Sequence, residues 1–89
     1  MLDKIWGILN KQKETYNNIM IDVSCCGDTV LLGNGELIDL MNCDECLTLC
    51  TENFTVSIPL NSNFEIVDND GIEISCTYLD IIITISLLE

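Results

Sequence analysis

Cysteines are the residues best suited to chemistry in this 89-residue chain, which contains no histidine. Cys43-x-x-Cys46 has a spacing that lets two thiolates approach one tetrahedral zinc ion, and Cys50 or the adjacent pair Cys25-Cys26 would complete four ligands. Such a zinc site would have to use cysteine alone or cysteine with carboxylates. The candidates for metal or disulfide bonds are Cys25, Cys26, Cys43, Cys46, Cys50 and Cys76.

Two other interpretations of these cysteines stay open. Six is an even number, as disulfides require, but the N-terminus has no apolar run long enough for a secretory signal. A disulfide between Cys25 and Cys26 would strain the backbone, so this pair would bond to two other partners, including other chains. The leading hypothesis is that the cysteines are reduced and packed as small hydrophobic residues. A thioredoxin-like role for Cys43 and Cys46 is disfavoured because acidic residues stand between them.

The remaining residues offer little for catalysis. No histidine is present to act as a general base, and no glycine-rich phosphate loop is found. Residues 68–71, Asp-Asn-Asp-Gly, resemble part of a calcium loop but lack the downstream bidentate glutamate. We therefore expect these residues to form a turn, and we expect the protein not to be an enzyme and to carry no cofactor, with zinc as the alternative.

The charge of the chain is strongly negative and unevenly distributed. Fifteen carboxylates and three lysines give a net charge of −12, and the lysines all lie within residues 4–13. Nucleic acid and anionic membranes are disfavoured as partners because both are bound largely through Lys and Arg. A basic protein surface or divalent cations would be favoured partners, but the leading interpretation is that the charge serves only to keep a strand-rich protein soluble.

The elements that must position these groups form a single domain over residues 1–89. Residues 1–16 have the apolar spacing of a short amphipathic helix, with Ile5, Trp6 and Leu9 on one face. Trp6 is expected to anchor this helix to the sheet, and a ligand-binding role is the alternative. Residues 19–88 alternate between apolar and polar side chains, which indicates strands. The predicted fold is mainly β, a small antiparallel barrel or strongly bent sheet of about six to seven strands.

Glycine and asparagine mark the predicted turns. Residues 25–28, residues 42–45 and residues 61–63 are expected to be turns. Residues 33–35, Gly-Asn-Gly, and residues 68–71 are expected to be hairpin turns because Asn-Gly and Asp-Gly readily adopt the positive φ that such turns require. Pro59 is expected at a strand end or sheet edge because it lacks an amide hydrogen.

The final predicted strand, residues 79–87, places apolar residues on one face. Either the core or a second subunit must cover this face, because an uncovered apolar strand promotes aggregation. With Trp6, its residues are the candidates for an interface: Leu79, Ile81, Ile83, Ile85 and Leu87.

The order of elements resembles that of Sm-like (SH3-like) small β-barrel proteins of short bacterial type. The resemblance covers residues 3–67 and includes Gly-x-Leu-x-x-x-Met-x-Cys at residues 35–43 and Ile-Pro-Leu at residues 58–60. It implies a small barrel and a tendency to form rings or other oligomers. It does not imply RNA binding, because the basic and aromatic loop residues of the RNA-binding members are missing, and residues 72–88 lie outside the pattern.

These features favour a non-catalytic structural or assembly module that self-associates or binds a protein partner, with a homo-oligomer expected. One alternative is an acidic, phage-type anti-defence inhibitor that occupies the basic groove of a nucleic-acid-binding enzyme. The other is a zinc-stabilised adaptor. Without a signal peptide or an apolar run long enough to span a bilayer, we expect a cytoplasmic protein without membrane association, and a spore- or virus-associated one is the alternative.

Overall fold

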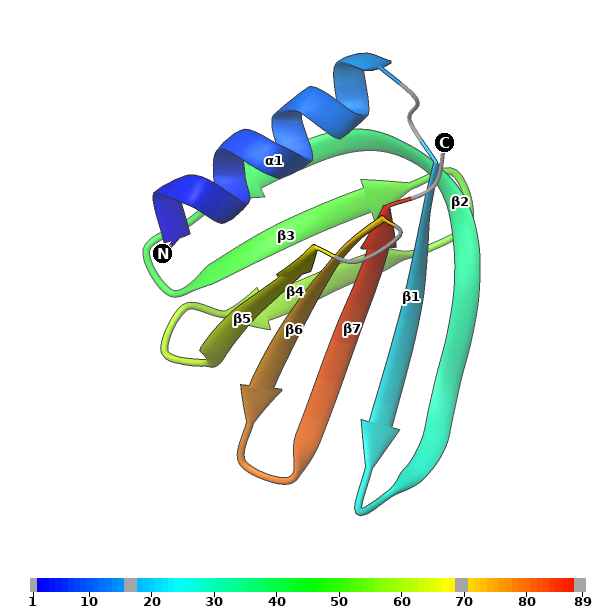
Figure 1. Cartoon of the computed structure of the whole chain (residues 1–89), viewed down its shortest axis with the longest axis vertical. Coiled ribbons are helices and arrows are strands. Elements are labelled where there is room, and N and C mark those ends of the chain that lie inside the picture. Colours follow the sequence, from blue (N-terminus) through cyan, green and yellow to red (C-terminus); the bar gives the residue numbers. More distant parts are fainter. Residues whose placement is uncertain (1, 16–17, 69–70, 88–89) are drawn as a thin grey trace.

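The computed structural model describes residues 2–15, 18–68 and 71–87 (Figure 1). Within these residues the fold is mainly β, as predicted: one helix is followed by seven strands in one antiparallel sheet. The elements are α1 (Leu2–Thr15), β1 (Asn18–Cys25), β2 (Asp28–Asn42), β3 (Cys46–Thr51), β4 (Thr55–Pro59), β5 (Asn63–Asp68), β6 (Ile72–Tyr78) and β7 (Ile81–Leu87).

The strands follow the order β4-β3-β2-β1-β7-β6-β5, so the sheet is not closed into a barrel. Figure 1 shows that the sheet is strongly bent. Strands β1 to β4 form one meander and β5 to β7 form a second, and β1 joins the two by pairing with β7. The strand boundaries confirm the predicted turns at residues 25–28 and 42–45, and Pro59 ends the edge strand β4 as expected. The prediction of a turn at residues 68–71 falls partly on residues 69–70, which lie outside the described residues. The antiparallel pairing of Asp68 with Ile72 agrees with a hairpin there.

The prediction of a hairpin turn at residues 33–35 is wrong, because these residues lie inside the 15-residue strand β2. They pair with β1, with Gly33 opposite Ile21 and Gly35 opposite Ile19. Neither glycine has a positive φ. The two glycines instead allow a close approach by the β3–β4 turn: an added Cβ would lie 3.0 Å from Phe54 on Gly33 and 3.0 Å from Asn53 on Gly35. The Asn53 side chain also donates a hydrogen bond to the Asn34 carbonyl at 2.8 Å.

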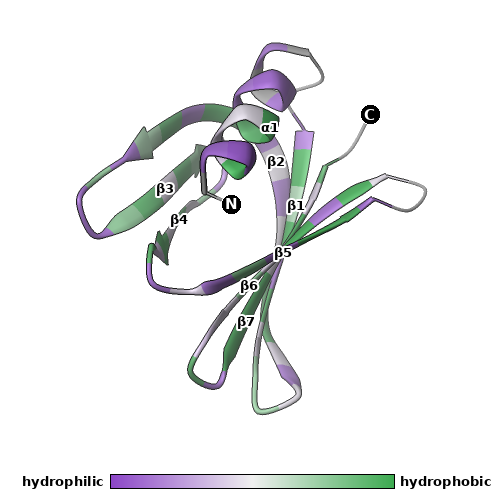
Figure 2. Cartoon of the chain, turned by 60° about the vertical axis from the view of Figure 1, so that its left-hand side comes forward, coloured by the Kyte–Doolittle hydropathy of each residue, from purple (hydrophilic) through white to green (hydrophobic). Residues whose placement is uncertain are grey.

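Helix α1 covers one end of the bent sheet, as Figures 1 and 2 show. Its Ile5 and Leu9 side chains are fully buried, and Trp6 is half-buried against the core, which agrees with an anchoring role. The Gln12 side-chain amide donates to the Asn18 carbonyl at 2.8 Å and ties the helix to the start of β1. The buried core comprises Ile5, Leu9, Ile19, Ile21, Leu37, Leu40, Leu47, Leu49, Val56, Ile58, Ile74, Cys76, Ile83 and Ile85.

The core covers most of the apolar face of the last strand, which was one of the two expected ways of covering it. Ile83 and Ile85 are buried in the core, and Leu87 is half-buried against it. The strand also begins two residues later than predicted, at Ile81, and Leu79 lies in the turn before it. The described part of the chain contains no helix that is long and apolar enough to cross a membrane.

Candidate functional site

The exposed apolar residues gather at the tips of two hairpins, β1–β2 and β6–β7. Nine large hydrophobic side chains are exposed among the described residues, and six of them belong to these two hairpins. We call these six residues the hairpin-tip surface: Val30, Leu31, Leu32, Leu79, Ile81 and Ile82. Figures 1 and 2 show both tips at the end of the molecule opposite α1.

The sheet holds the two hairpins side by side. Strands β1 and β7 are neighbours, and Cys25 at the end of β1 pairs with Ile81 at the start of β7. The Cys26 amide donates a hydrogen bond of 3.3 Å to the Asp80 carbonyl and so links the two turns. The hairpin-tip surface is therefore positioned by backbone pairing.

Both faces of the sheet are apolar at this end. Leu31 lies opposite Val23, which packs against the core, so Leu31 is on the same face of the sheet as the core. At the tip, however, this face is exposed. Leu32 lies opposite the polar Asp22 and belongs to the outer face. A register shift in β1–β2 between Val23 and Ser24 accommodates Val30 as an extra residue. This end of the sheet therefore exposes apolar side chains on both faces.

Each tip contains a residue in a strained backbone conformation. Cys26 has a φ of 55° and Leu79 a φ of 56°, in the left-handed region that glycine and asparagine favour. Leu79 is 81% exposed, so its side chain contributes little to packing. Strained residues of this kind concentrate at functional sites. The folding of the chain therefore does not explain a leucine at this position, which indicates a role in contact with another molecule.

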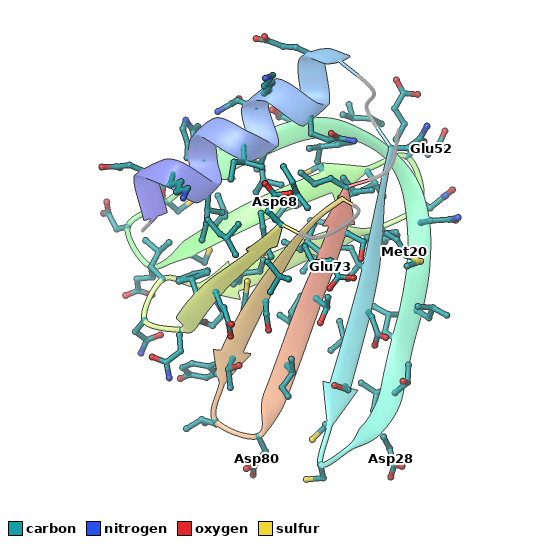
Figure 3. All side chains as sticks on the ribbon, in the orientation of Figure 1. Met20, Asp28, Glu52, Asp68, Glu73 and Asp80 are labelled. Atoms are coloured by element: carbon teal, nitrogen blue, oxygen red, sulfur yellow. The ribbon has the colours of Figure 1, made fainter. Side chains whose placement is uncertain are left out.

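Carboxylates surround the hairpin-tip surface. Asp28 and Asp80 lie at the ends of the two hairpins, as Figure 3 shows, and both are exposed. Asp22 follows on the outer face beside Leu32. No lysine or arginine occurs in the chain after Lys13, so no positive side chain from the strands can neutralise these groups. The tips combine apolar side chains with negative charge.

Two cysteine thiols lie at the same tip. The Sγ atoms of Cys25 and Cys26 are 3.8 Å apart. The pKa of Cys25 is raised, first by its hydrogen bond to the Cys26 side chain, then by electrostatic repulsion from the Cys26 sulfur, by desolvation and by the negative charge of Asp80. Cys25 therefore keeps its proton at neutral pH, and a ligand that binds its sulfur must displace that proton.

The other predicted cysteine candidates are not brought to this pair. Cys43 is exposed in the β2–β3 turn, and Cys46 begins β3, half-buried, with its Sγ 3.7 Å from the Thr48 hydroxyl. Strand β2 runs between this turn and the tip that carries Cys25 and Cys26. In the structure, all six cysteines are free thiols: Cys25, Cys26, Cys43, Cys46, Cys50 and Cys76. Within the described ranges, no group of three or more His, Cys, Asp or Glu residues is arranged to hold a metal ion.

Cys76 and Cys50 occupy different environments. Cys76 is buried in the core, between Phe64 on β5 and Ile83 on β7, and burial raises the pKa of its thiol to about 12. This position matches the hypothesis of a packed, reduced cysteine. Cys50 is half-buried on β3, paired with Asp39 and Thr55.

Sequence reasoning did not identify the apolar residues of β2 as part of a site. The pattern of residues 19–88 predicts only strands, yet Val30, Leu31 and Leu32 are three consecutive apolar residues that break the alternation expected of a half-buried strand. That break was the available signal. Of the predicted interface residues, Leu79 and Ile81 belong to the hairpin-tip surface, and Trp6, Ile83, Ile85 and Leu87 do not.

Comparisons with protein-family models, with curated proteins and with solved structures find no match.

Proposed function

We propose that this chain is a non-catalytic protein-binding module that inserts its hairpin-tip surface into an apolar groove of a partner protein. The observation that carries the proposal is Leu79, a bulky apolar residue that is 81% exposed and held in left-handed backbone. Folding would favour asparagine or glycine there. Exposed apolar patches of this kind are typical of interaction surfaces.

The charge around the tips supports a partner with basic residues at the rim of its groove. Asp28 and Asp80 flank the apolar residues, and opposite charges on the partner would speed association and orient it. A second copy of the chain would bring its own Asp28 and Asp80 against these groups. Ile83 and Ile85 are buried in the core, so of the apolar face that favoured self-association Leu79 and Ile81 stay exposed. A basic protein partner is therefore preferred to a homo-oligomer.

The acidic inhibitor is a narrower form of the same proposal. An enzyme that binds nucleic acid offers a basic groove, and fourteen carboxylates with no positive residue after Lys13 complement it. The resemblance to Sm-like small barrels is retained as a proposal about the fold family. It is supported by the helix followed by a meander whose second strand is long and, as Figure 1 shows, bent.

The test compares the wild-type chain with a double variant, Leu79→Ser and Ile82→Ser. A double variant, Ile38→Ser and Val67→Ser, is the matched control, because both residues are exposed and apolar but lie outside the hairpin-tip surface. We expect quantitative capture from cell extract to recover a basic protein with wild type and control, and at least tenfold less with the tip variant. Binding of the purified partner should weaken in high salt without being abolished.

Sedimentation velocity distinguishes the second-copy alternative. If the proposal is correct, we expect wild type and both variants to sediment as monomers. A wild-type dimer that only the tip variant abolishes would show that the occupant is a second copy. Equal recovery of the partner by the tip variant and the control would refute the proposal.

A further inference from the structure

We propose that Cys25 and Cys26 form a two-thiolate site for a soft monovalent cation of the Cu(I) class. This inference does not depend on the proposed protein partner. Both thiols lie at the β1–β2 tip, Cys26 is exposed and Cys25 is half-exposed, so an ion can reach both from solvent.

The separation of the two sulfurs suits a shared ion. Metal–thiolate bonds are about 2.3 Å long, and two such bonds at trigonal or tetrahedral angles place their sulfurs about 3.8–4.0 Å apart. The Sγ atoms of Cys25 and Cys26 are 3.8 Å apart. One ion can therefore contact both sulfurs with little rearrangement of the turn.

The number and type of ligands favour a soft monovalent ion over zinc. Structural zinc sites are closed by four ligands, and the part of the chain that the structure describes offers no third cysteine or carboxylate arranged with this pair. Thiolates prefer soft ions, and Cu(I) is stable with two or three ligands. The carboxylates of Asp28 and Asp80 are hard donors that Cu(I) does not prefer. A third position on the ion stays open to a small-molecule thiol or water.

The turn itself does not require these thiols. Cys26 and Gly27 both have positive φ, 55° and 88°, as a two-residue hairpin turn requires, and asparagine suits the first of these positions better than cysteine. On binding, two S–H bonds lose their protons to solvent and two Cu–S bonds form. No electron is transferred.

The experiment titrates the reduced full-length protein with Cu(I) under anaerobic conditions, in competition with a chromogenic Cu(I) chelator. Native mass spectrometry measures the stoichiometry. We expect one tightly bound ion per chain, and at least a hundredfold weaker binding for Cys26→Asn, which keeps the turn. Cys25→Ser should also weaken binding, whereas Cys43→Ser, which removes an exposed single thiol, should leave it unchanged.

Circular dichroism of each variant shows that the sheet is retained. A parallel titration with Zn(II) and a zinc chelator should show no tight zinc binding by wild type or by Cys26→Asn. The proposal would be overturned if Cys26→Asn and Cys25→Ser bound Cu(I) as tightly as wild type. It would also be overturned if wild type failed to remove Cu(I) from the chelator, or if one ion were bound between two chains.

Discussion

Gly33 lies directly against the ring of Phe54: a Cβ on this glycine would stand 3.0 Å from Cε1 of the ring. Gly33 belongs to β2 and Phe54 to the turn between β3 and β4, so the contact joins two distant parts of the bent sheet. The φ of Gly33 is not positive, so its backbone conformation does not require glycine. Glycine is needed here because the Phe54 ring approaches the backbone closely. Several consequences of this arrangement and of the hairpin-tip surface can be measured.

Replacing Gly33 by valine should destabilise the protein by about 1–3 kcal/mol, because the Phe54 ring must move away from a well-packed position. Urea denaturation measures the loss. Gly7→Ala is the control: nothing lies within 4 Å of an added Cβ there, and alanine should stabilise the helix by up to about 1 kcal/mol. The loss should shrink when Gly33→Val is measured in a Phe54→Ala background. An unchanged loss in that background would contradict the proposed contact.

Replacing Ile85 by alanine should cost about 2–5 kcal/mol, because its side chain is fully buried in the core. Ile82→Ala, in the same strand, should cost less than about 1 kcal/mol because that side chain is 42% exposed. The two variants test which face of β7 the core covers. Similar losses in thermal or urea unfolding would show that the register of β7 is wrong.

Replacing Leu79 by asparagine should raise the free energy of unfolding by roughly 0.5–1 kcal/mol, because asparagine tolerates the left-handed backbone better than leucine. The same variant should bind the partner protein less tightly. Leu79→Ala separates the two effects: it removes the apolar side chain without relieving the backbone, so it should weaken binding without a gain in stability. A less stable Leu79→Asn variant would argue against strain at this turn.

The buried thiol of Cys76 should make stability fall in alkaline solution. Burial raises its pKa from 9.0 to about 12. Below pH 9 the thiol is protonated in both the folded and the unfolded chain, so it has no effect on stability. Between pH 9 and pH 12 the unfolded chain loses this proton and the folded chain keeps it, so the free energy of unfolding decreases by up to about 1.4 kcal/mol per pH unit.

Urea unfolding of the reduced protein between pH 8 and pH 10.5 measures this slope. Cys76→Ala removes the titrating group, so its stability should fall less steeply with pH, although its stability at pH 8 is lower. Other groups titrate equally in both proteins, and the difference between the two slopes isolates Cys76. Equal slopes would mean that water reaches the thiol in the folded state.

Local patterns determined much of this protein. Strict alternation fixed the core face of Ile72–Tyr78 and Ile81–Leu87, and helical spacing fixed the buried side of Leu2–Thr15. The turn at Cys26 and Gly27 was also readable, because glycine and short polar residues mark a change of direction wherever they occur between strands. Composition fixed the anionic character of the strand region, since the sequence supplies no positive residue after Lys13.

Only the tertiary structure decided the role of residues 33–35 and the location of the exposed apolar surface. Gly-Asn-Gly is as compatible with a hairpin turn as with a bent strand, and the packing of Phe54 and Asn53 against the glycines selects the strand. Likewise, Ile81, Ile83 and Ile85 have the same local pattern, yet Ile85 and Ile83 are buried and Ile81 is exposed. Burial depends on which distant strands and which helix reach each residue, and alternation along one strand carries no information about them.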